Sequence, residues 1–177
     1  MTWSSLDLAG HCRADAQRTS TFGAALTQII TAEDVVLDIG AGSGVLSLIS
    51  VRCGAKRTIA VENDQTVFSF LSRGIKQSGS PIELVWSDAF TADLPRADVL
   101  IAELIDVWLL EEEFAAIIAS LATRGVIAAN TRIVPSGYAF DIAFGFVDWH
   151  EHFPEVPWPH YEWPYYDTGS WEIVTFN

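Results

Sequence analysis

Short apolar runs recur along most of the chain and alternate with stretches of helical periodicity. A run that is apolar at nearly every position is typical of a parallel strand covered on both faces, because strict alternation is expected only where one face meets water. Strands are therefore predicted over 35–39, 58–61, 82–86, 97–102 and 126–134. A further strand, with alternating character, is predicted over 138–147.

Helical patterns fill the intervals between these runs. Candidate helix caps are Asp7 or Ser20 near the start of the chain, and Asn63 or Asp64 after the second run. Alternation of strands and helices indicates an α/β fold, a doubly wound and mainly parallel sheet of Rossmann-like type in a single domain over 1–148. Right-handed crossovers then bring the carboxyl ends of the strands to one rim. The helices are predicted over 6–31, 45–51, 64–77 and 111–121.

A glycine-rich turn follows the first predicted strand. Asp38 lies near the end of this strand, and Gly40, Gly42 and Gly44 alternate with other residues before the next helix. Glycines let the backbone approach a ligand closely, and the start of a helix offers unpaired N–H groups. A dinucleotide-binding turn has one more residue before its third glycine and holds a pyrophosphate, which the Asp38 carboxylate would repel. The same carboxylate would attract the cationic end of an amino acid.

A second acidic residue, Glu62, ends the second predicted strand. It lies at roughly the separation from the glycines at which nucleotide-binding βαβ units place an acid on ribose hydroxyls. With this acid, the turn resembles motif I of the class I S-adenosylmethionine-dependent methyltransferases. The resemblance implies S-adenosyl-L-methionine as cofactor, with its amino-acid end at Asp38, Gly40, Ala41, Gly42 and Gly44, its ribose at Glu62 and Asn63, and its adenine at Asp88 and Ala89.

Two glutamates near the fourth strand form a second candidate site. Glu103 directly follows this strand, and Glu112 lies nine residues further on. A loop between strand and helix can return the second carboxylate beside the first, and a pair of carboxylates suits the N–H fork of a guanidinium. The segment resembles the double-glutamate loop of the protein arginine methyltransferases, in the form with Glu-Leu-x-Asp at its start that is found in the monomethylating branch.

Further segments extend this resemblance, which covers about residues 9–147. The sequence from Arg18 to Phe22 is similar to the Arg-Thr-x-Thr-Tyr segment of that family, with phenylalanine in place of tyrosine, and 133–136 is similar to the pattern after the fifth strand. The resemblance implies methyl transfer to an arginine guanidinium of a protein. It assigns Arg18 to the cofactor carboxylate, and Glu103 and Glu112 to the guanidinium as catalytic residues.

Other interpretations of the same residues stay open. The acidic residues 111–113 also suit the positive end of a helix dipole, and Arg18 also suits a surface ion pair. The acceptor can instead be RNA or a small molecule, although Glu-Leu-Ile-Asp at 103–106 replaces the Pro-Pro-aromatic motif of many amino-methylating nucleic-acid enzymes. A third interpretation, of a different class, is a cofactor-binding or interaction subunit without catalysis.

Charge and composition narrow the partners. The chain has 10 basic residues against 23 acidic ones, a formal net charge of −13. Nucleic-acid binding depends on lysine and arginine, so nucleic acid is disfavoured and a cationic acceptor is favoured. No apolar run reaches the roughly 18 residues that span a membrane, and residues 1–10 lack signal-peptide features, which predicts a cytoplasmic protein. Cys12 and Cys53 are expected to be reduced thiols.

The last segment, 149–177, differs in composition from the rest. It is rich in aromatic residues and proline and has no lysine or arginine. The prolines exclude a regular helix, while the aromatic residues argue against disorder. We expect this segment to pack on the domain or at an interface, for example in a homodimer. His150, His152 and His160 have no recognised metal-ligand spacing, so no metal is predicted.

Overall fold

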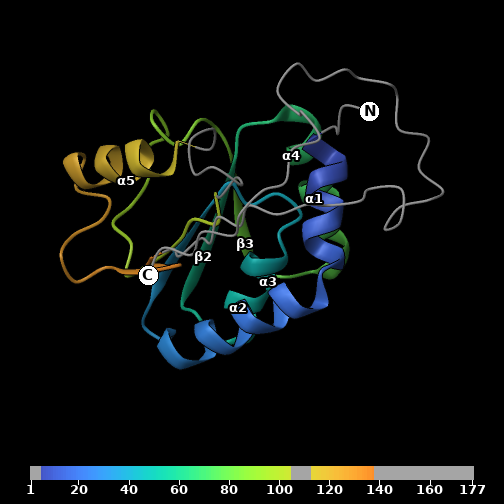
Figure 1. Ribbon diagram of the computed structural model, residues 1–177, viewed down its shortest axis with the longest axis horizontal. Coiled ribbons are helices and arrows are strands. Elements are labelled where there is room, and N and C mark those ends of the chain that lie inside the picture. Colours follow the sequence, from blue (N-terminus) through green and yellow to red (C-terminus); the bar gives the residue numbers. More distant parts are fainter. Residues whose placement is uncertain (1–4, 105–112, 138–177) are drawn as a thin grey trace, which may run out of the picture. The chain divides into compact units, whose positions relative to one another are not determined.

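The computed structural model describes residues 5–104 and 113–137, which form a parallel sheet with helices on both faces (Figure 1). The strand order is β3-β2-β1-β4-β5, and each neighbouring pair runs parallel, which confirms the predicted doubly wound fold. The strands are β1 (Val35–Ile39), β2 (Arg57–Glu62), β3 (Ile82–Trp86), β4 (Val99–Ile101) and β5 (Arg132–Val134). The helices are α1 (Ser5–Ala14), α2 (Ala16–Ile29), α3 (Val45–Arg52), α4 (Gln65–Ser78) and α5 (Phe114–Thr123).

Strand β1 lies in the middle of the sheet, and the glycine turn follows its carboxyl end. Val36 pairs with Thr58 of β2 on one side and with Val99 of β4 on the other. Val36 and Leu37 are fully buried although successive side chains of a strand point to opposite faces. Burial on both faces explains why the sequence of this strand is apolar rather than alternating.

Different helices cover the two faces of the sheet. On one face, Val36 packs with Leu26 of α2 and Leu46 of α3, and α4 covers β2 and β3 through Leu71. On the other face, Leu37 packs in a cluster with Leu121 of α5 and with the segment 89–97. The two layers leave the carboxyl ends of the strands accessible between α1, α4 and α5.

The observed helix caps differ in part from those predicted. Asp15 is the N-cap of α2, and its Oδ1 accepts a hydrogen bond from the Arg18 backbone N–H at 2.8 Å. The prediction of Asp7 or Ser20 is wrong, because both lie inside helices and the chain breaks between α1 and α2 at Asp15. Asp64 caps α4 as predicted, since its Oδ1 accepts from the backbone N–H groups of the second and third helical residues.

The fifth strand is shorter than the apolar run predicted. Only Arg132–Val134 pairs with β4. The Val126 N–H donates to the Leu121 carbonyl, so the first part of the run closes the end of α5 and packs into the core there. A turn follows, in which the Thr131 N–H donates to the Ala128 carbonyl.

Some predictions concern residues outside the described ranges. These are Glu112, the strand over 138–147 and the aromatic segment 149–177 with its three histidines. The boundary predicted at 148 also lies there.

Candidate functional site

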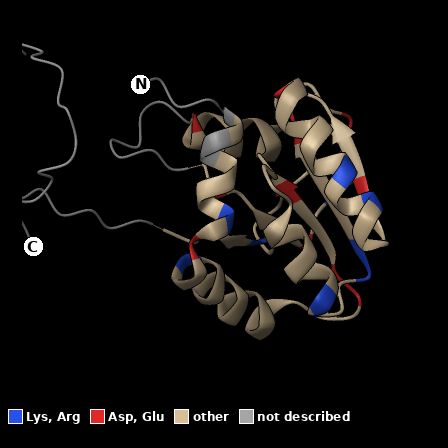
Figure 2. Ribbon diagram, turned by 90° about the vertical axis from the view of Figure 1, so that its right-hand side faces the viewer, with Lys and Arg blue, Asp and Glu red and all other residues tan. Residues whose placement is uncertain are grey.

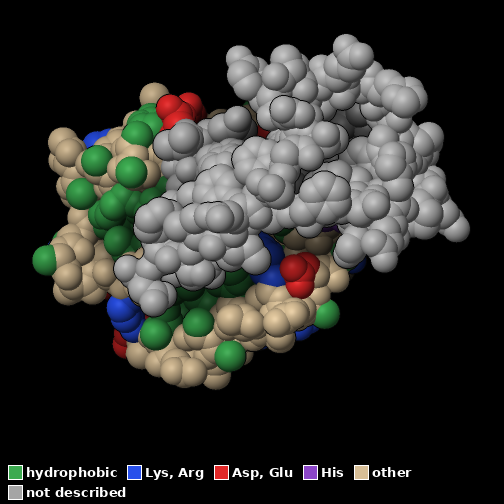
Figure 3. Space-filling model, viewed as in Figure 1, with side chains coloured by type: hydrophobic (Ala, Val, Ile, Leu, Met, Phe, Trp, Pro, Cys, Tyr) green, Lys and Arg blue, Asp and Glu red, His purple; other side chains and the backbone are tan. Residues whose placement is uncertain are grey.

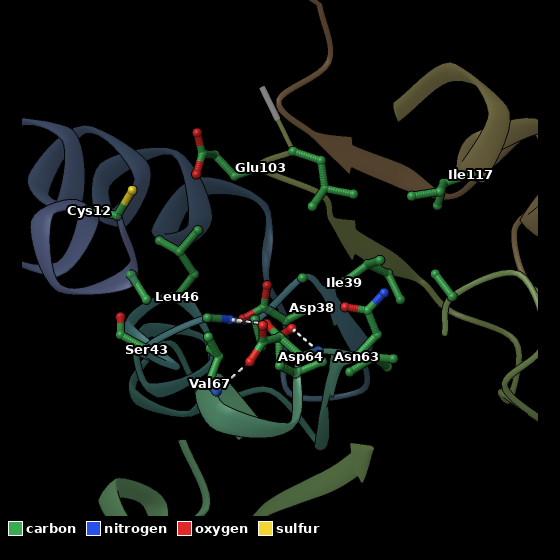
Figure 4. A pocket seen from close by; sticks show the side chains of 18 of the residues that line it. Cys12, Asp38, Ile39, Ser43, Leu46, Asn63, Asp64, Val67, Glu103 and Ile117 are labelled. Atoms are coloured by element: carbon green, nitrogen blue, oxygen red, sulfur yellow. Dashed lines mark hydrogen bonds between the residues drawn. The ribbon is translucent and has the colours of Figure 1, made fainter. Parts of the chain in front are cut away.

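A pocket of about 510 Å³ opens at the carboxyl ends of β1, β2 and β4 (Figure 4). Helix α1 contributes one wall through Cys12, and the start of α4 contributes another through Asp64 and Val67. Ten of the twelve predicted site residues line the pocket, although they come from distant parts of the sequence. They are Arg18, Asp38, Gly40, Ala41, Gly42, Glu62, Asn63, Asp88, Ala89 and Glu103.

The glycine turn brings backbone, rather than side chains, to the pocket wall. Gly40 has a φ of +68°, and a Cβ there would clash with the Leu104 side chain. The Ala41 N–H donates to the Val61 carbonyl at 3.0 Å, which ties the turn to β2. Gly44 is different, because it does not line the pocket: it is the buried N-cap of α3 and faces Leu71 of α4. Gly44 was predicted at the cofactor. The structure places it in the packing beneath the turn.

The Glu62 carboxylate is fixed between the glycine turn and the start of α4. Its Oε2 accepts a hydrogen bond from the Gly42 N–H at 3.0 Å, and its Oε1 accepts from the Asp64 N–H at 2.9 Å. The side chain is largely buried, with the residue 8% exposed. Each carboxylate oxygen retains acceptor capacity beyond these bonds, so Glu62 is a rigid acceptor for a pair of hydroxyl groups.

Asp38 lies deeper, beneath the turn. It is 2% exposed, and its Oδ2 accepts a hydrogen bond from the Ser47 hydroxyl at 2.5 Å. Burial raises the pKa of Asp38 from 3.8 to about 7, with Glu62 adding to the rise, while Ser47 and Arg18 oppose it. A carboxyl group with this pKa changes its charge near neutral pH, and a cation bound close by would favour its ionised form.

Asp88 and its neighbours form the wall at the end of β3. The Oδ1 of Asp88 accepts from the Phe90 N–H at 2.7 Å, and the Asp88 carbonyl accepts from the Ala92 N–H at 2.9 Å. These bonds close a turn directly after Ser87, whose own N–H donates to the Glu62 carbonyl. The carboxylate is solvent-exposed and lines the pocket.

Arg18 and Glu103, which both line the pocket, form an ion pair. The Arg18 Nη2 donates to Glu103 Oε2, and the two side chains are 18% and 21% exposed. The same guanidinium donates to the Cys12 carbonyl and lies over the Phe22 ring, with its Cζ 5.3 Å from the ring centroid. The structure therefore places a guanidinium group on the Glu103 carboxylate.

The pocket is acidic. Six carboxylate side chains and one guanidinium line it among the described residues. Such a lining attracts cations and repels phosphate, which agrees with the exclusion of a dinucleotide from the glycine spacing. The acidic residues are Asp38, Glu62, Asp64, Asp88, Glu103 and Glu113.

Comparison with known families identifies the fold and its ligand class. The sequence model of the ribosomal protein L11 methyltransferases, PrmA, matches residues 18–134, which includes the glycine turn, Glu62, Asp88 and Glu103. The chain belongs to this family. The predicted class I methyltransferase fold is thereby confirmed, together with S-adenosyl-L-methionine as the cofactor of the family.

Individual relatives include an uncharacterized protein and a probable arginine methyltransferase. An uncharacterized protein of Methanocaldococcus jannaschii is 34% identical over 124 residues, 69% of this chain and 48% of that protein. A probable histone-arginine methyltransferase CARM1 of Oryza sativa is 32% identical over 131 residues, 71% of this chain and 24% of that protein. The chain thus spans about half or less of the length of these relatives.

A solved structure of arginine methyltransferase type shares the fold. It is the Trypanosoma brucei PRMT1 enzyme-prozyme complex with AdoHcy, with a TM-score of 0.63 and 19% identity, covering 79% of this chain and 45% of that chain. At this identity the likeness concerns the fold.

The PrmA cofactor fits the groups that the pocket offers. The volume of the pocket, about 510 Å³, lies within the range of roughly 300–1,000 Å³ that is usual for small-molecule sites. Among the described residues, a Cβ on Gly42 would approach the Ala9 Cβ and the Gly40 carbonyl, both at 3.8 Å, so the backbone surface there is not closed off by them. The fixed Glu62 carboxylate suits ribose hydroxyls, Arg18 suits a carboxylate, and the acidic lining suits a sulfonium and an ammonium.

Among the pocket residues that sequence reasoning did not assign to the site are Cys12 and Glu113. Cys12 comes from the loosely patterned first helix, so no motif marked it. Glu113 has a φ of +48°. Among the described residues, it is the single non-glycine residue with a left-handed backbone. The sequence predicts Glu113 only as an acidic residue at the start of a helix. Its side chain makes no capping hydrogen bond to α5.

Within 5–104 and 113–137, no helix is long and apolar enough to cross a membrane. In the same part of the chain, no cluster of His, Cys, Asp and Glu side chains is arranged to hold a metal ion.

Proposed function

We propose that this protein transfers a methyl group from S-adenosyl-L-methionine to an arginine guanidinium of a protein substrate. The observation that carries the arginine specificity is the ion pair of Glu103, in which this carboxylate already holds a guanidinium group in the lining of the pocket. The sequence similarity to a probable histone-arginine methyltransferase supports the same acceptor. A net charge of −13 favours a cationic protein segment over nucleic acid.

The residues of the pocket divide into a cofactor side and an acceptor side. On the cofactor side, Glu62 accepts from the ribose hydroxyls, Asp88 accepts from the adenine amino group, and Asp38 lies toward the ammonium. Asn63 and Ala89 complete this wall, and the turn of Gly40, Ala41 and Gly42 supplies backbone contacts. A guanidinium has five N–H donors, so Arg18 can hold the cofactor carboxylate while it remains paired with Glu103.

Glu103 orients the acceptor nitrogen. When bound, the cofactor supplies an electrophilic methyl carbon on sulfur, and the carbon–sulfur bond breaks with its electron pair left on sulfur as the nitrogen bonds to carbon. Holding the acceptor in line with this carbon is where the protein contributes most. The nitrogen loses one proton, which Glu112 would help to remove. Glu112 remains the second predicted carboxylate and lies outside the described residues.

Isothermal titration tests the division of roles. We expect S-adenosylhomocysteine to bind the wild type, and an arginine-rich peptide to bind once the nucleoside is present. In Glu103→Gln, peptide binding should be lost while the nucleoside affinity changes by less than about threefold, because this carboxylate holds the acceptor. In Glu62→Gln, the nucleoside affinity should fall by about tenfold or more, since a charged hydrogen-bond acceptor is removed.

Glu83→Gln is the matched control. Glu83 is also paired with an arginine, Arg57, but near the amino ends of β3 and β2, away from the pocket. This variant should bind nucleoside and peptide as the wild type does. Equal loss of nucleoside binding in Glu103→Gln and Glu62→Gln would contradict the proposed roles.

A second candidate acceptor is a ribosomal protein, and the match to the ribosomal protein L11 methyltransferase family favours it. The same titration with purified L11 in place of the peptide distinguishes the two acceptors. Nucleoside binding without any protein response would move the substrate to RNA or a small molecule, and binding without methyl transfer to any acceptor would indicate a non-catalytic subunit. The cytoplasmic location and the homodimer stay predictions from the sequence.

A further inference from the structure

Arg124 makes a contact that the proposed function does not yet use. This residue is the C-cap of α5, and its side chain reaches the segment after β3, more than 30 residues earlier in the sequence. Its Nη1 donates to the carbonyls of Ala89 at 2.6 Å and Phe90 at 2.9 Å. Its Nη2 donates to the carbonyl of Ala92. One guanidinium therefore holds three carbonyl groups of a single loop.

The loop that Arg124 holds is a wall of the pocket. Ser87, Asp88, Ala89 and Phe90 all line it. Within the loop, the N–H groups of Phe90 and Ala92 point back to Asp88, while the carbonyls point outward to Arg124. The hydrogen bonds to Asp88 and those from Arg124 involve the same few peptide units. The position of the Asp88 carboxylate therefore depends on both sets of bonds.

The side-chain chemistry makes this contact specific to arginine. A planar guanidinium presents several N–H donors in a fixed arrangement, whereas a lysine ammonium is a compact charge on a flexible stem. A cation at this point is also favoured by the carbonyl end of α5. The Asp88 Oδ1 accepts a hydrogen bond from the Phe90 N–H, so the turn constrains the orientation of this carboxylate, which lines the pocket.

We propose that Arg124 is a positioning residue that aims the Asp88 carboxylate at the exocyclic amino group of the cofactor's adenine. It thereby sets the preference of the site for a 6-aminopurine over a 6-oxopurine. This inference rests on the proposed function, because it requires that the pocket binds the adenosyl group with Asp88 at the adenine.

The experiment compares two ligands that differ at this one group. S-adenosylhomocysteine and its inosine analogue, in which oxygen replaces the amino group, are titrated calorimetrically into the purified protein. We expect the wild type to prefer the adenosine ligand by about tenfold or more, since a carboxylate facing a carbonyl oxygen loses a hydrogen bond and gains repulsion. In Arg124→Gln this ratio should fall to about threefold or less, mainly through weaker binding of the adenosine ligand.

Three further variants separate positioning from stability. Asp88→Asn should abolish or invert the preference, because its amide can donate to the 6-oxo group. Arg124→Lys, which keeps the charge but not the fork of donors, should also lower the ratio and covers the case in which Arg124→Gln fails to fold. Arg132→Gln is the matched control: Arg132 donates to the Ile29 carbonyl and pairs with Asp34 away from the pocket, so its loss should lower stability and leave the ratio unchanged.

The outcomes are distinct. A ratio in Arg124→Gln and Arg124→Lys equal to that of the wild type overturns the positioning role, and so does a wild type that binds both ligands equally. A wild type that binds neither ligand overturns the proposed function itself. A fall of the ratio in both Arg124 variants but not in Arg132→Gln supports the inference.

Discussion

Asp38 is a carboxyl group that the fold withdraws from water at the base of the cofactor side. Burial raises its pKa to about 7, while the Ser47 hydroxyl and Arg18 partly offset this rise. The pKa of Asp38 in the folded protein lies above its ordinary value of 3.8. The contribution of this group to the free energy of unfolding is therefore fully present below about pH 4. Its contribution is lost as the pH rises through 7, so ionisation costs stability that a bound cation can restore.

The affinity for S-adenosylhomocysteine should therefore depend on pH near neutrality. If the bound ammonium requires the ionised carboxylate, binding should be about tenfold weaker at pH 6 than at pH 8, with release of about half a proton at pH 7. Titration calorimetry in buffers of different ionisation enthalpy measures both quantities. Asp38→Asn should show neither the pH dependence nor the proton release, and a flat profile in the wild type would show that Asp38 does not face the ammonium.

At the scale of elements, the packing of α3 on α4 explains one glycine of the turn. Gly44 has a φ of +76°, and a Cβ there would lie 2.5 Å from Leu71 Cδ1 and 3.3 Å from Ile75 Cδ1. Leu71 is fully buried, so its side chain has little room to yield. The third glycine of the motif thus serves the approach of two helices, while Gly40 and Gly42 present backbone to the pocket.

Gly44→Ala should destabilise the protein by about 2–4 kcal/mol, from the left-handed backbone and from overpacking against Leu71. Gly54→Ala is the control, because Gly54 has a φ of +89° but an added Cβ would meet no atom of the described residues within 4 Å. It should cost only about 1–2 kcal/mol. Chemical denaturation of both variants measures the difference, and equal costs would mean that Leu71 yields without penalty.

The elements that the sequence predicted well are those specified by local signals. The strand, turn and helix around Asp38 follow from an apolar run and three glycines, and Asp64 has the side chain and position of a cap. The fifth strand was predicted too long, because an apolar stretch can close a helix end as well as pair in a sheet. Val126 does the former, and only its bond to the Leu121 carbonyl reveals this.

At the scale of the whole molecule, charge decides which partners approach. The sequence carries a formal net charge of −13. Figure 2 shows basic residues scattered singly over the described ribbon, without a continuous stripe. On the face shown in Figure 3, apolar side chains gather over α5. A phosphate backbone would find little to bind on these surfaces, while a basic peptide would be attracted.

Binding of an arginine-rich peptide should accordingly weaken as salt is added. Between about 50 and 300 mM sodium chloride, we expect the Kd to rise by about fivefold or more, because the Debye length shortens across this range. The Kd of S-adenosylhomocysteine, which carries no net charge, is the internal control and should change much less. A peptide affinity that does not respond to salt would contradict electrostatic recognition.

Residues of the candidate site could be predicted only where the sequence directly around them carries a signal. Glu62 and Asp88 stand at strand ends, and parallel topology alone gathers such residues at one rim. The pairing of Arg18 with Glu103 joins residues 85 positions apart, and Arg124 reaches back over 30 positions to the loop after Asp88. No local pattern encodes such contacts, so they emerge only from the folded structure.

Helix α5 connects the two sides of the pocket with a fixed length. The N-cap Glu113 and Ile117 of its first turn line the pocket, and its C-cap Arg124 holds the loop after β3. Ten residues of helix span about 15 Å, and one inserted residue would turn everything beyond it by about 100°. A change in the length of α5 should therefore move Arg124 away from the carbonyl groups that it holds. An engineer who wishes to change the methyl acceptor therefore has to keep the length of α5 between Phe114 and Thr123 unchanged.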